Sequence, residues 1–241
     1  MKILNNAFIL LATSFVLTSC FIDVERGSGN RSTEVREIEG FEEIEFSGSY
    51  SVYLEEGETE KVTITADDNL HQYITTENRG GKLAIDSEKN LSSRKGIEVY
   101  VTYKKLTGIY MSGASSVQNE GTLTGDQLRL SLSGAGSVDL KLELESLDLS
   151  ISGAGSARLS GSCDKQNVSM SGAGGLKSYD LVSNTCYIGI SGVGGAEITV
   201  LEKLSASVSG VGGIDYKGDP EILQKDVSGI GSIERSGDPN I

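Results

Sequence analysis

The chain has 241 residues and carries 34 acidic against 21 basic side chains, which gives a net charge of −13 at pH 7. Such a charge repels phosphate backbones and anionic lipid surfaces, so the composition excludes a typical nucleic-acid-binding protein. With 31 glycines, two prolines and no tryptophan, it favours a tightly wound β fold over a collagen-like or disordered chain.

The first twenty residues have the pattern of a bacterial lipoprotein signal peptide. Lys2 precedes an apolar run, residues 7–17, that is too short for a permanent membrane span, and small residues precede Cys20. We expect residues 1–19 to be removed and Cys20 to be acylated, so that lipid alone anchors the protein. The alternatives are an ordinary secretory signal or a short buried helix with an incidental cysteine. The expected location is the cell envelope, anchored to the outer membrane, with the leaflet undecided.

The next two segments lead into a repeated region. Residues 20–36 are mostly polar, without periodic apolar positions, and predict a flexible tether. Residues 37–110 contain short alternating runs that predict strands at 41–46, 51–54, 61–65, 82–86 and 97–103. A short helical turn capped by Asp67 or Asp68 is expected between them. We expect this lead-in to cap the first regular coil, because a solenoid must cover its ends to stay soluble.

From Met111 to Arg235 the phrase Ser-Gly-x-Gly, or a close variant, recurs seven times. The mean step between the serines is (228 − 112)/6, about 19 residues, which is a solenoid period. Ser47-Gly48-Ser49 resembles a degenerate earlier copy. The serines that open the seven phrases are Ser112, Ser133, Ser152, Ser171, Ser191, Ser209 and Ser228.

The positions around each serine alternate as they do in strands. The residue before the serine is apolar in every copy, as is the fifth residue after it, whereas the sixth is polar or charged. A helix would space its apolar residues by three and four. The pattern therefore predicts an all-β chain that forms a parallel β-helix of about 19-residue coils, one domain over residues 37–241 with regular coils from 111 to 235. The motifs of leucine-rich and calcium-binding nonapeptide repeats are absent.

The lipoprotein-like start, the Phe41 to Leu54 opening, the 82–86 and 97–103 strands and the Ser-Gly-Ala-Gly phrases together resemble a known bacterial family. It is the putative auto-transporter adhesin, head GIN domain family, common among Bacteroidetes, and the resemblance spans residues 38–233. It implies a right-handed parallel β-helix without established catalytic residues. The family name suggests adhesion, and no single residue's role carries over.

Few residues offer catalytic chemistry. His71 is the only histidine, no serine stands in Gly-x-Ser-x-Gly, and we expect His71 to be exposed. Cys163 and Cys186 are 23 positions apart, about three residues out of coil register, which favours two buried free thiols over a disulfide. Neither cysteine has metal-ligand spacing, so no metal and no cofactor is expected.

The polar column that follows each phrase is the candidate interaction face. As a solvated face it would contribute slight charge-ladder stabilisation; as a functional face it would bind a glycan or another surface protein. Its members are Asp139, Arg158, Lys177, Glu197, Asp215 and Glu234.

The sequence thus predicts a non-catalytic cell-envelope lipoprotein that presents an extended solenoid surface, in adhesion or envelope interactions. The alternative is a carbohydrate-active β-helix enzyme, either a polysaccharide lyase or a hydrolase. Between Tyr110 and the end of the chain only Tyr179, Tyr187 and Tyr216 are aromatic, so platforms for stacking sugars are scarce. The predicted partners are a membrane, through the lipid anchor, and a glycan or surface-protein ligand; the oligomeric state stays open.

Overall fold

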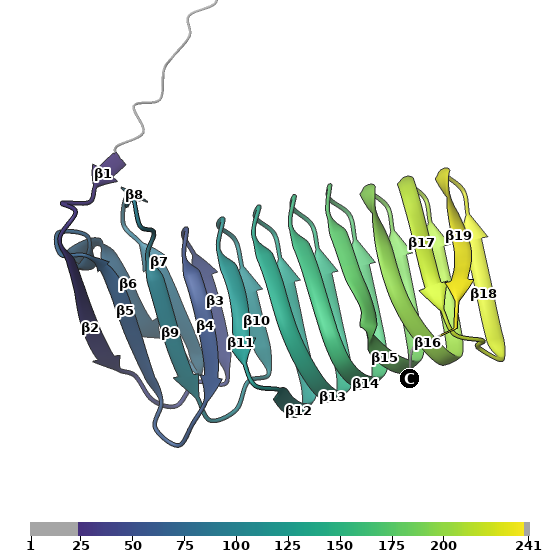
Figure 1. Ribbon diagram of the computed structural model, residues 1–241, viewed down its shortest axis with the longest axis horizontal. Coiled ribbons are helices and arrows are strands. Elements are labelled where there is room, and N and C mark those ends of the chain that lie inside the picture. The colour runs from purple at the N-terminus through teal and green to yellow at the C-terminus, as the bar shows by residue number, and fades with distance from the viewer. Residues whose placement is uncertain (1–23, 239–241) are drawn as a thin grey trace, which may run out of the picture.

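The computed structural model describes residues 24–238 as a stack of β-strand coils along one long axis (Figure 1). This confirms the predicted all-β solenoid with coils of about 19 residues. None of the helical structure within residues 24–238 has the length and hydropathy that a membrane span needs. The predicted signal peptide and its acylation site Cys20 lie outside the described residues.

Each regular coil passes along two long faces of the solenoid that meet at the Ser-Gly-x-Gly corner. We call the face before the corner the serine face; it contains β10, β12, β18 and the second halves of β13 to β16. The face after the corner is the charged face; it contains β11, β17, β19 and the first halves of β13 to β16. The strands are β10 (Gly108–Met111), β11 (Ser116–Glu120), β12 (Leu123–Leu132), β13 (Ser137–Ile151), β14 (Ser156–Met170), β15 (Gly175–Ile190), β16 (Val193–Val208), β17 (Val211–Lys217), β18 (Ile222–Val227) and β19 (Ile230–Gly237).

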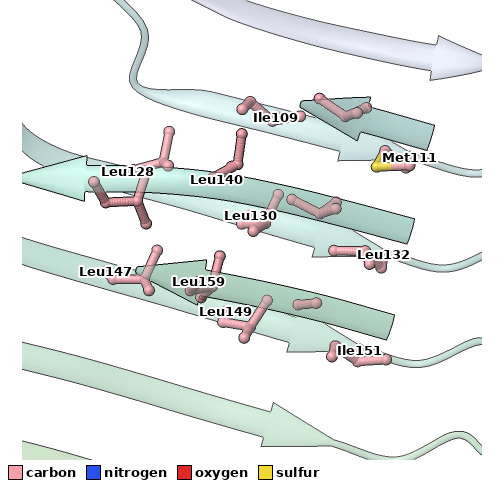
Figure 2. Close-up of a cluster of buried hydrophobic side chains, with 14 of the residues drawn as sticks. Ile109, Met111, Leu128, Leu130, Leu132, Leu140, Leu147, Leu149, Ile151 and Leu159 are labelled. Atoms are coloured by element: carbon pink, nitrogen blue, oxygen red, sulfur yellow. The ribbon is translucent and has the colours of Figure 1, made fainter. Parts of the chain in front are cut away.

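The core is a set of apolar columns that run along the solenoid axis. On the serine face, Leu130 pairs in parallel register with Leu149, which pairs with Val168 in the next coil. Leu140 and Leu159 enter the same core from the charged face (Figure 2). Burying one such side chain fully contributes roughly 1.5–3 kcal/mol, so the repeated apolar positions stabilise the stack coil by coil.

The corner brings the backbones of successive coils too close for a side chain. The Ala135 N–H donates to the Gly113 carbonyl oxygen at 3.1 Å, and a Cβ on Gly134 would overlap that same oxygen. The apolar residue that follows the first glycine points outward, and at the C-terminal end it becomes large: Val193 is 59%, Val211 48% and Ile230 79% exposed. Glycine is therefore repeated because the coils stack closely at this corner.

The first coils do not follow chain order. β3 (Glu43–Ser47) pairs with β10 on one side and with β7 (Lys82–Ser87) on the other. β4 (Ser51–Glu56) likewise lies between β11 and β9 (Glu98–Tyr103). The coil of β3 and β4 is thus inserted between the coil of β7 and β9 and the regular array, and the degenerate Ser47-Gly48-Ser49 phrase forms its corner.

Antiparallel strands cover the N-terminal end of the solenoid, as the predicted cap requires. β2 (Arg31–Glu37) pairs with β5 (Lys61–Asp67), and β5 pairs with β9. β6 (Ile74–Asn78) pairs with β7. The parallel ladder therefore ends beneath these strands, and its apolar core is shielded from solvent.

The predicted flexible tether is wrong for the described part of residues 20–36. β1 (Val24–Arg26) pairs with β8 (Asn90–Ser92), and β2 begins at Arg31. The alternation that marks a strand is missing in β2 because its side chains remain largely in solvent; Val35 is 62% exposed. Backbone pairing with β5 makes this segment a strand, and the paired residues lie between 24 and 36 positions apart along the chain, from Glu37 with Lys61 to Arg31 with Asp67.

The expectation that His71 is exposed is also wrong. Its side chain is 3% exposed, with Nε2 3.2 Å from the Ser32 carbonyl oxygen and Nδ1 3.5 Å from a carboxylate oxygen of Glu34. Strand β2 lies over it, a contact that the polar sequence around His71 does not reveal. The expected helical turn is the 3-10 turn η1 (His71–Tyr73), whose N-cap, Leu70, makes no side-chain capping hydrogen bond.

A lysine, rather than a set of covering strands, protects the C-terminal end of the solenoid. Lys225 occupies a core column, in register with Ala206, and its ammonium group donates to the Ile233 carbonyl oxygen at 3.1 Å. It also lies 4.6 Å from the ring centroid of Tyr216. A charge that points inward on the last strand of the serine face disfavours pairing with another chain, which protects this open edge.

Candidate functional site

The six residues of the predicted charged column lie in a single ladder on the charged face. Strand register pairs them consecutively, from Asp139 with Arg158 to Asp215 with Glu234. The one ion pair that forms between neighbours, Arg158 Nε to Asp139 Oδ2, spans 3.9 Å with both side chains about two-thirds exposed. Such a pair contributes little to stability, because water screens it.

This column continues onto the inserted coil and the coil of β7 and β9 with uncharged residues. Gln118 is in register with Asp139 and with Tyr53, and Tyr53 with Tyr100. The rings of Tyr53 and Tyr100 stack with centroids 4.7 Å apart. The outward column of the charged face therefore has an aromatic end and a charged end.

The serine face has a groove of about 550 Å³, and none of the six charged-column residues lines it. Its floor is an outward column of small side chains, Ser131, Ser150, Ser169, Gly189 and Ser207, in register from coil to coil. Its wall is the adjacent outward column, Arg129, Asp148, Asn167, Tyr187 and Ser205. The groove exists because the floor residues reach less far from the sheet than the wall residues do.

A hydrogen-bonded carboxylate stands in the middle of the wall. The Asn167 side-chain amide donates to Asp148 Oδ1 at 2.7 Å, and the Gln127 amide donates to Asp148 Oδ2 at 2.9 Å. Both carboxylate oxygens therefore have a donor from the protein itself. The two amides hold the carboxylate in one orientation beside the floor of the groove.

Tyr187 is the aromatic residue of the wall. Its ring is flanked by Lys165, with Nζ 5.5 Å from the centroid, and by Lys203, with Nζ 5.1 Å away. A hydrogen bond from Lys203 lowers the pKa of Tyr187 below its usual value, and the positive charges of Lys203 and Lys165 act in the same direction. The ring is thus held between two cations while 37% of the residue stays exposed.

Tyr110 closes the N-terminal end of the groove. Its hydroxyl donates to Glu43 Oε1 at 3.3 Å, and Lys82 Nζ lies 4.0 Å from its ring centroid. These contacts fix the ring, so this end of the groove has a defined shape.

The two cysteines and the histidine of the described chain lie away from this groove. Cys163 and Cys186 are free, as expected, and their register partners, Ser183 and Gln166, confirm the three-residue offset. Burial raises the pKa of each thiol to about 12. His71 belongs to the cap. Within residues 24–238 no three His, Cys, Asp or Glu side chains gather as a metal site.

The groove was not predicted from the sequence, although the repeats contain the two outward columns that form it. The floor residues stand two positions, and the wall residues four positions, before the serine of each phrase, as Ser150 and Asp148 do before Ser152. Their common face follows from strand alternation. The depth of the groove depends on how neighbouring coils pack, which the alternation does not show.

A family model described as "Putative auto-transporter adhesin, head GIN domain" matches residues 40–220. Among solved structures, a putative adhesin from Bacteroides fragilis NCTC 9343 is 26% identical with a TM-score of 0.84, covering 88% of this chain and 99% of that one. A putative lipid binding protein from Parabacteroides distasonis ATCC 8503 is 25% identical with a TM-score of 0.70 over the same shares of the two chains. No curated protein matches the chain.

A third structure shares the fold at lower identity. A putative adhesin from Parabacteroides merdae ATCC 43184 has a TM-score of 0.68 at 24% identity, covering 88% of this chain and 99% of that one. The stacked-coil architecture described above is therefore common to several chains of this kind.

Proposed function

Because this chain belongs to the putative auto-transporter adhesin, head GIN domain family, we propose that it is a non-catalytic cell-envelope lipoprotein that presents its solenoid surface in adhesion or envelope interactions. Family membership suggests a protein of the cell envelope or surface. Acylation of Cys20 and attachment to the outer membrane are the finer parts of the proposal, and they rest on the sequence pattern before Cys20.

The observation that carries the proposal is the unbroken register of the outward columns on both faces. From Asp139 to Glu234 each coil places one side chain directly beside its counterpart in the next coil. A ligand that lies along the axis can therefore contact several coils at once, and weak contacts add up over a rigid surface. Turnover needs an acid, a base or a nucleophile gathered at one point, and the described surface spreads its charged groups in rows.

The lipid anchor has its own test. The full chain, expressed in a bacterium that processes lipoproteins, should incorporate a labelled fatty acid and partition with the membrane fraction. Replacing Cys20 with Ser should abolish both the label and the membrane association. Retention of the label in the Cys20→Ser variant would contradict acylation at this position.

The surface role is tested with the mature chain, produced as a soluble protein. Its binding to whole cells and to a glycan panel is measured beside the release of new reducing ends from the same glycans. Saturable binding without release is the expected outcome. Release of reducing ends would contradict the non-catalytic proposal and move the protein to the alternative class, the carbohydrate-active β-helix enzymes.

A further inference from the structure

The cations beside the groove on the serine face lack carboxylate partners. Within residues 24–238 neither Arg129, Lys165 nor Lys203 has a carboxylate oxygen within 4.0 Å of a side-chain nitrogen. Asp148 is the one carboxylate among the residues that line the groove. Together the three cations around the groove create a local potential that attracts an anion.

The floor of the groove offers hydroxyl groups rather than a dry apolar surface. Ser150, Ser169 and Ser207 are exposed, and within the described part of the chain their hydroxyls make no hydrogen bond to another protein group. Ser150 and Ser169 are one coil apart, roughly 4.8 Å, whereas Gly189 stands between Ser169 and Ser207. Hydroxyl donors and acceptors spaced by whole coils along the axis suit a linear ligand that is itself rich in hydroxyl groups.

The wall supplies the two other features that saccharide binding uses. Asp148 and Asn167 form an acceptor and donor pair, linked at 2.7 Å, beside the floor. One coil further on, Tyr187 presents its ring between two lysines. An aromatic ring packs against the apolar C–H face of a sugar, while amide and carboxylate groups bind its hydroxyls.

From these features together we propose that the groove on the serine face binds an acidic saccharide. The exposed part of the Tyr187 ring packs against a sugar ring, Lys165 and Lys203 pair with its carboxylate, and Ser150, Ser169 and Asn167 bind its hydroxyls. The inference rests on the proposed surface role and deepens it by naming the ligand class and the face. A neutral glycan would leave the lysines without a partner, and a peptide would leave the serine row largely unused.

The experiment uses the mature chain and a glycan array that carries uronic-acid and sialic-acid oligosaccharides beside neutral ones, followed by calorimetric titration with oligogalacturonate and its methyl ester. The ester keeps the shape of the sugar and removes its charge. Acidic oligosaccharides should bind saturably. The ester should bind at least about tenfold more weakly than the acid, because it loses charge-assisted hydrogen bonds. Binding of the acid should weaken as salt rises from low to high concentration.

Two variants locate the site, each with a matched control on the charged face. Lys165→Ala with Lys203→Ala should lower the affinity about tenfold, whereas Lys177→Ala with Lys141→Ala, an equal charge change, should leave it within about twofold. Tyr187→Ala should weaken binding, whereas Tyr100→Ala, which removes a ring that is 40% exposed, should not. Unchanged thermal unfolding of each variant shows that the fold is intact.

The outcomes separate this inference from the function on which it rests. Equal loss in the groove variants and in their controls, or equal binding of the acid and its ester, overturns the site or its preference for charge. If no acidic oligosaccharide binds while the chain still binds cells, the inference fails and the proposed surface role stands. If groove variants lose oligosaccharide and cell binding together, the groove is the adhesive site.

Discussion

Gly48 and Gly113 lie directly one above the other in adjacent coils, although β4 to β10 separate them in the chain. The Ala114 N–H donates to the Gly48 carbonyl oxygen at 2.9 Å, and a Cβ on Gly113 would overlap that oxygen. The same contact recurs at each following corner of the array. The inserted coil therefore belongs to the same close-packed ridge as the regular repeats.

Because the coils are in such close contact along this ridge, we expect that adding a methyl group at a corner glycine lowers the stability of the fold. Gly153→Ala places a Cβ against the Gly134 carbonyl oxygen, so we expect a loss of roughly 1–3 kcal/mol in the free energy of unfolding. Gly125→Ala is the matched control, because its Cβ would meet only Leu144 Cδ2, at 3.9 Å. Denaturant unfolding of both variants measures the difference. Equal stabilities would show that the corner relaxes and that close stacking does not explain the glycine.

Lys225, which ends a core column at the C-terminal end of the solenoid, should limit self-association of the protein. Lys225→Leu removes the inward charge and leaves an apolar end beside Leu223 and Val227, which are 44% and 43% exposed. We expect the mean mass in light scattering to rise with protein concentration more steeply than in the unmodified chain. Lys177→Leu, on the charged face, is the control. An identical concentration dependence in both variants would contradict the protective role of Lys225.

The two cysteines should react only slowly with alkylating reagents in the folded protein. Burial raises the pKa of Cys163 and of Cys186 from 9.0 to about 12, so only a minute fraction of either is thiolate at pH 8. Alkylation by iodoacetamide should therefore be slow in buffer and rapid in denaturant. Mass spectrometry counts the modified sites. Fast labelling in buffer would mean that the coil opens locally around these residues.

The same burial predicts that stability falls in alkali. Between pH 9 and pH 12 the folded chain keeps thiol protons that the unfolded chain has lost, so stability present below pH 9 is lost as the pH rises. Each thiol contributes a slope of about 1.4 kcal/mol per pH unit in that window. Tyr50 and Tyr103, whose pKa values burial raises to about 12, act in the same direction above pH 10.

Replacing both cysteines with Ala isolates their share of the alkaline effect. Unfolding free energies measured from pH 8 to pH 11 should fall less steeply in the Cys163→Ala, Cys186→Ala variant than in the unmodified chain. The comparison concerns the slope, because the substitutions also lower stability at every pH by removing buried atoms. Parallel curves would assign the alkaline loss to the tyrosines alone.

The charged column should contribute little to folding. Arg158→Ala removes an exposed pair that spans 3.9 Å, and we expect the free energy of unfolding to change by less than about 0.5 kcal/mol. Denaturant unfolding at low and high salt tests this. A larger loss that disappears at high salt would show that the column acts as a coupled network, and that the predicted interaction face is chiefly a stabilising ladder.

The repeated positions made the regular array predictable. A buried column, such as the one through Val138, Ala157 and Leu176, needs an apolar residue at every step, because each coil presents the same position to the core. The sequence of residues 111–235 therefore determined the strand type, the coil length, the outward charged column and the register offset between Cys163 and Cys186. All of these depend on neighbours about one coil apart.

Only the tertiary structure decided the features that depend on distant or asymmetric packing. His71 is buried because β2 lies over it, and the coil of Ile44 is inserted between those of Leu83 and Ile109 because strand pairing takes no account of chain order. The groove beside Tyr187 arises from the relative reach of two adjacent columns. Alternation along a strand indicates which side chains point away from the core. The depth of the groove and the pairing of the strands depend on how the coils stack in space.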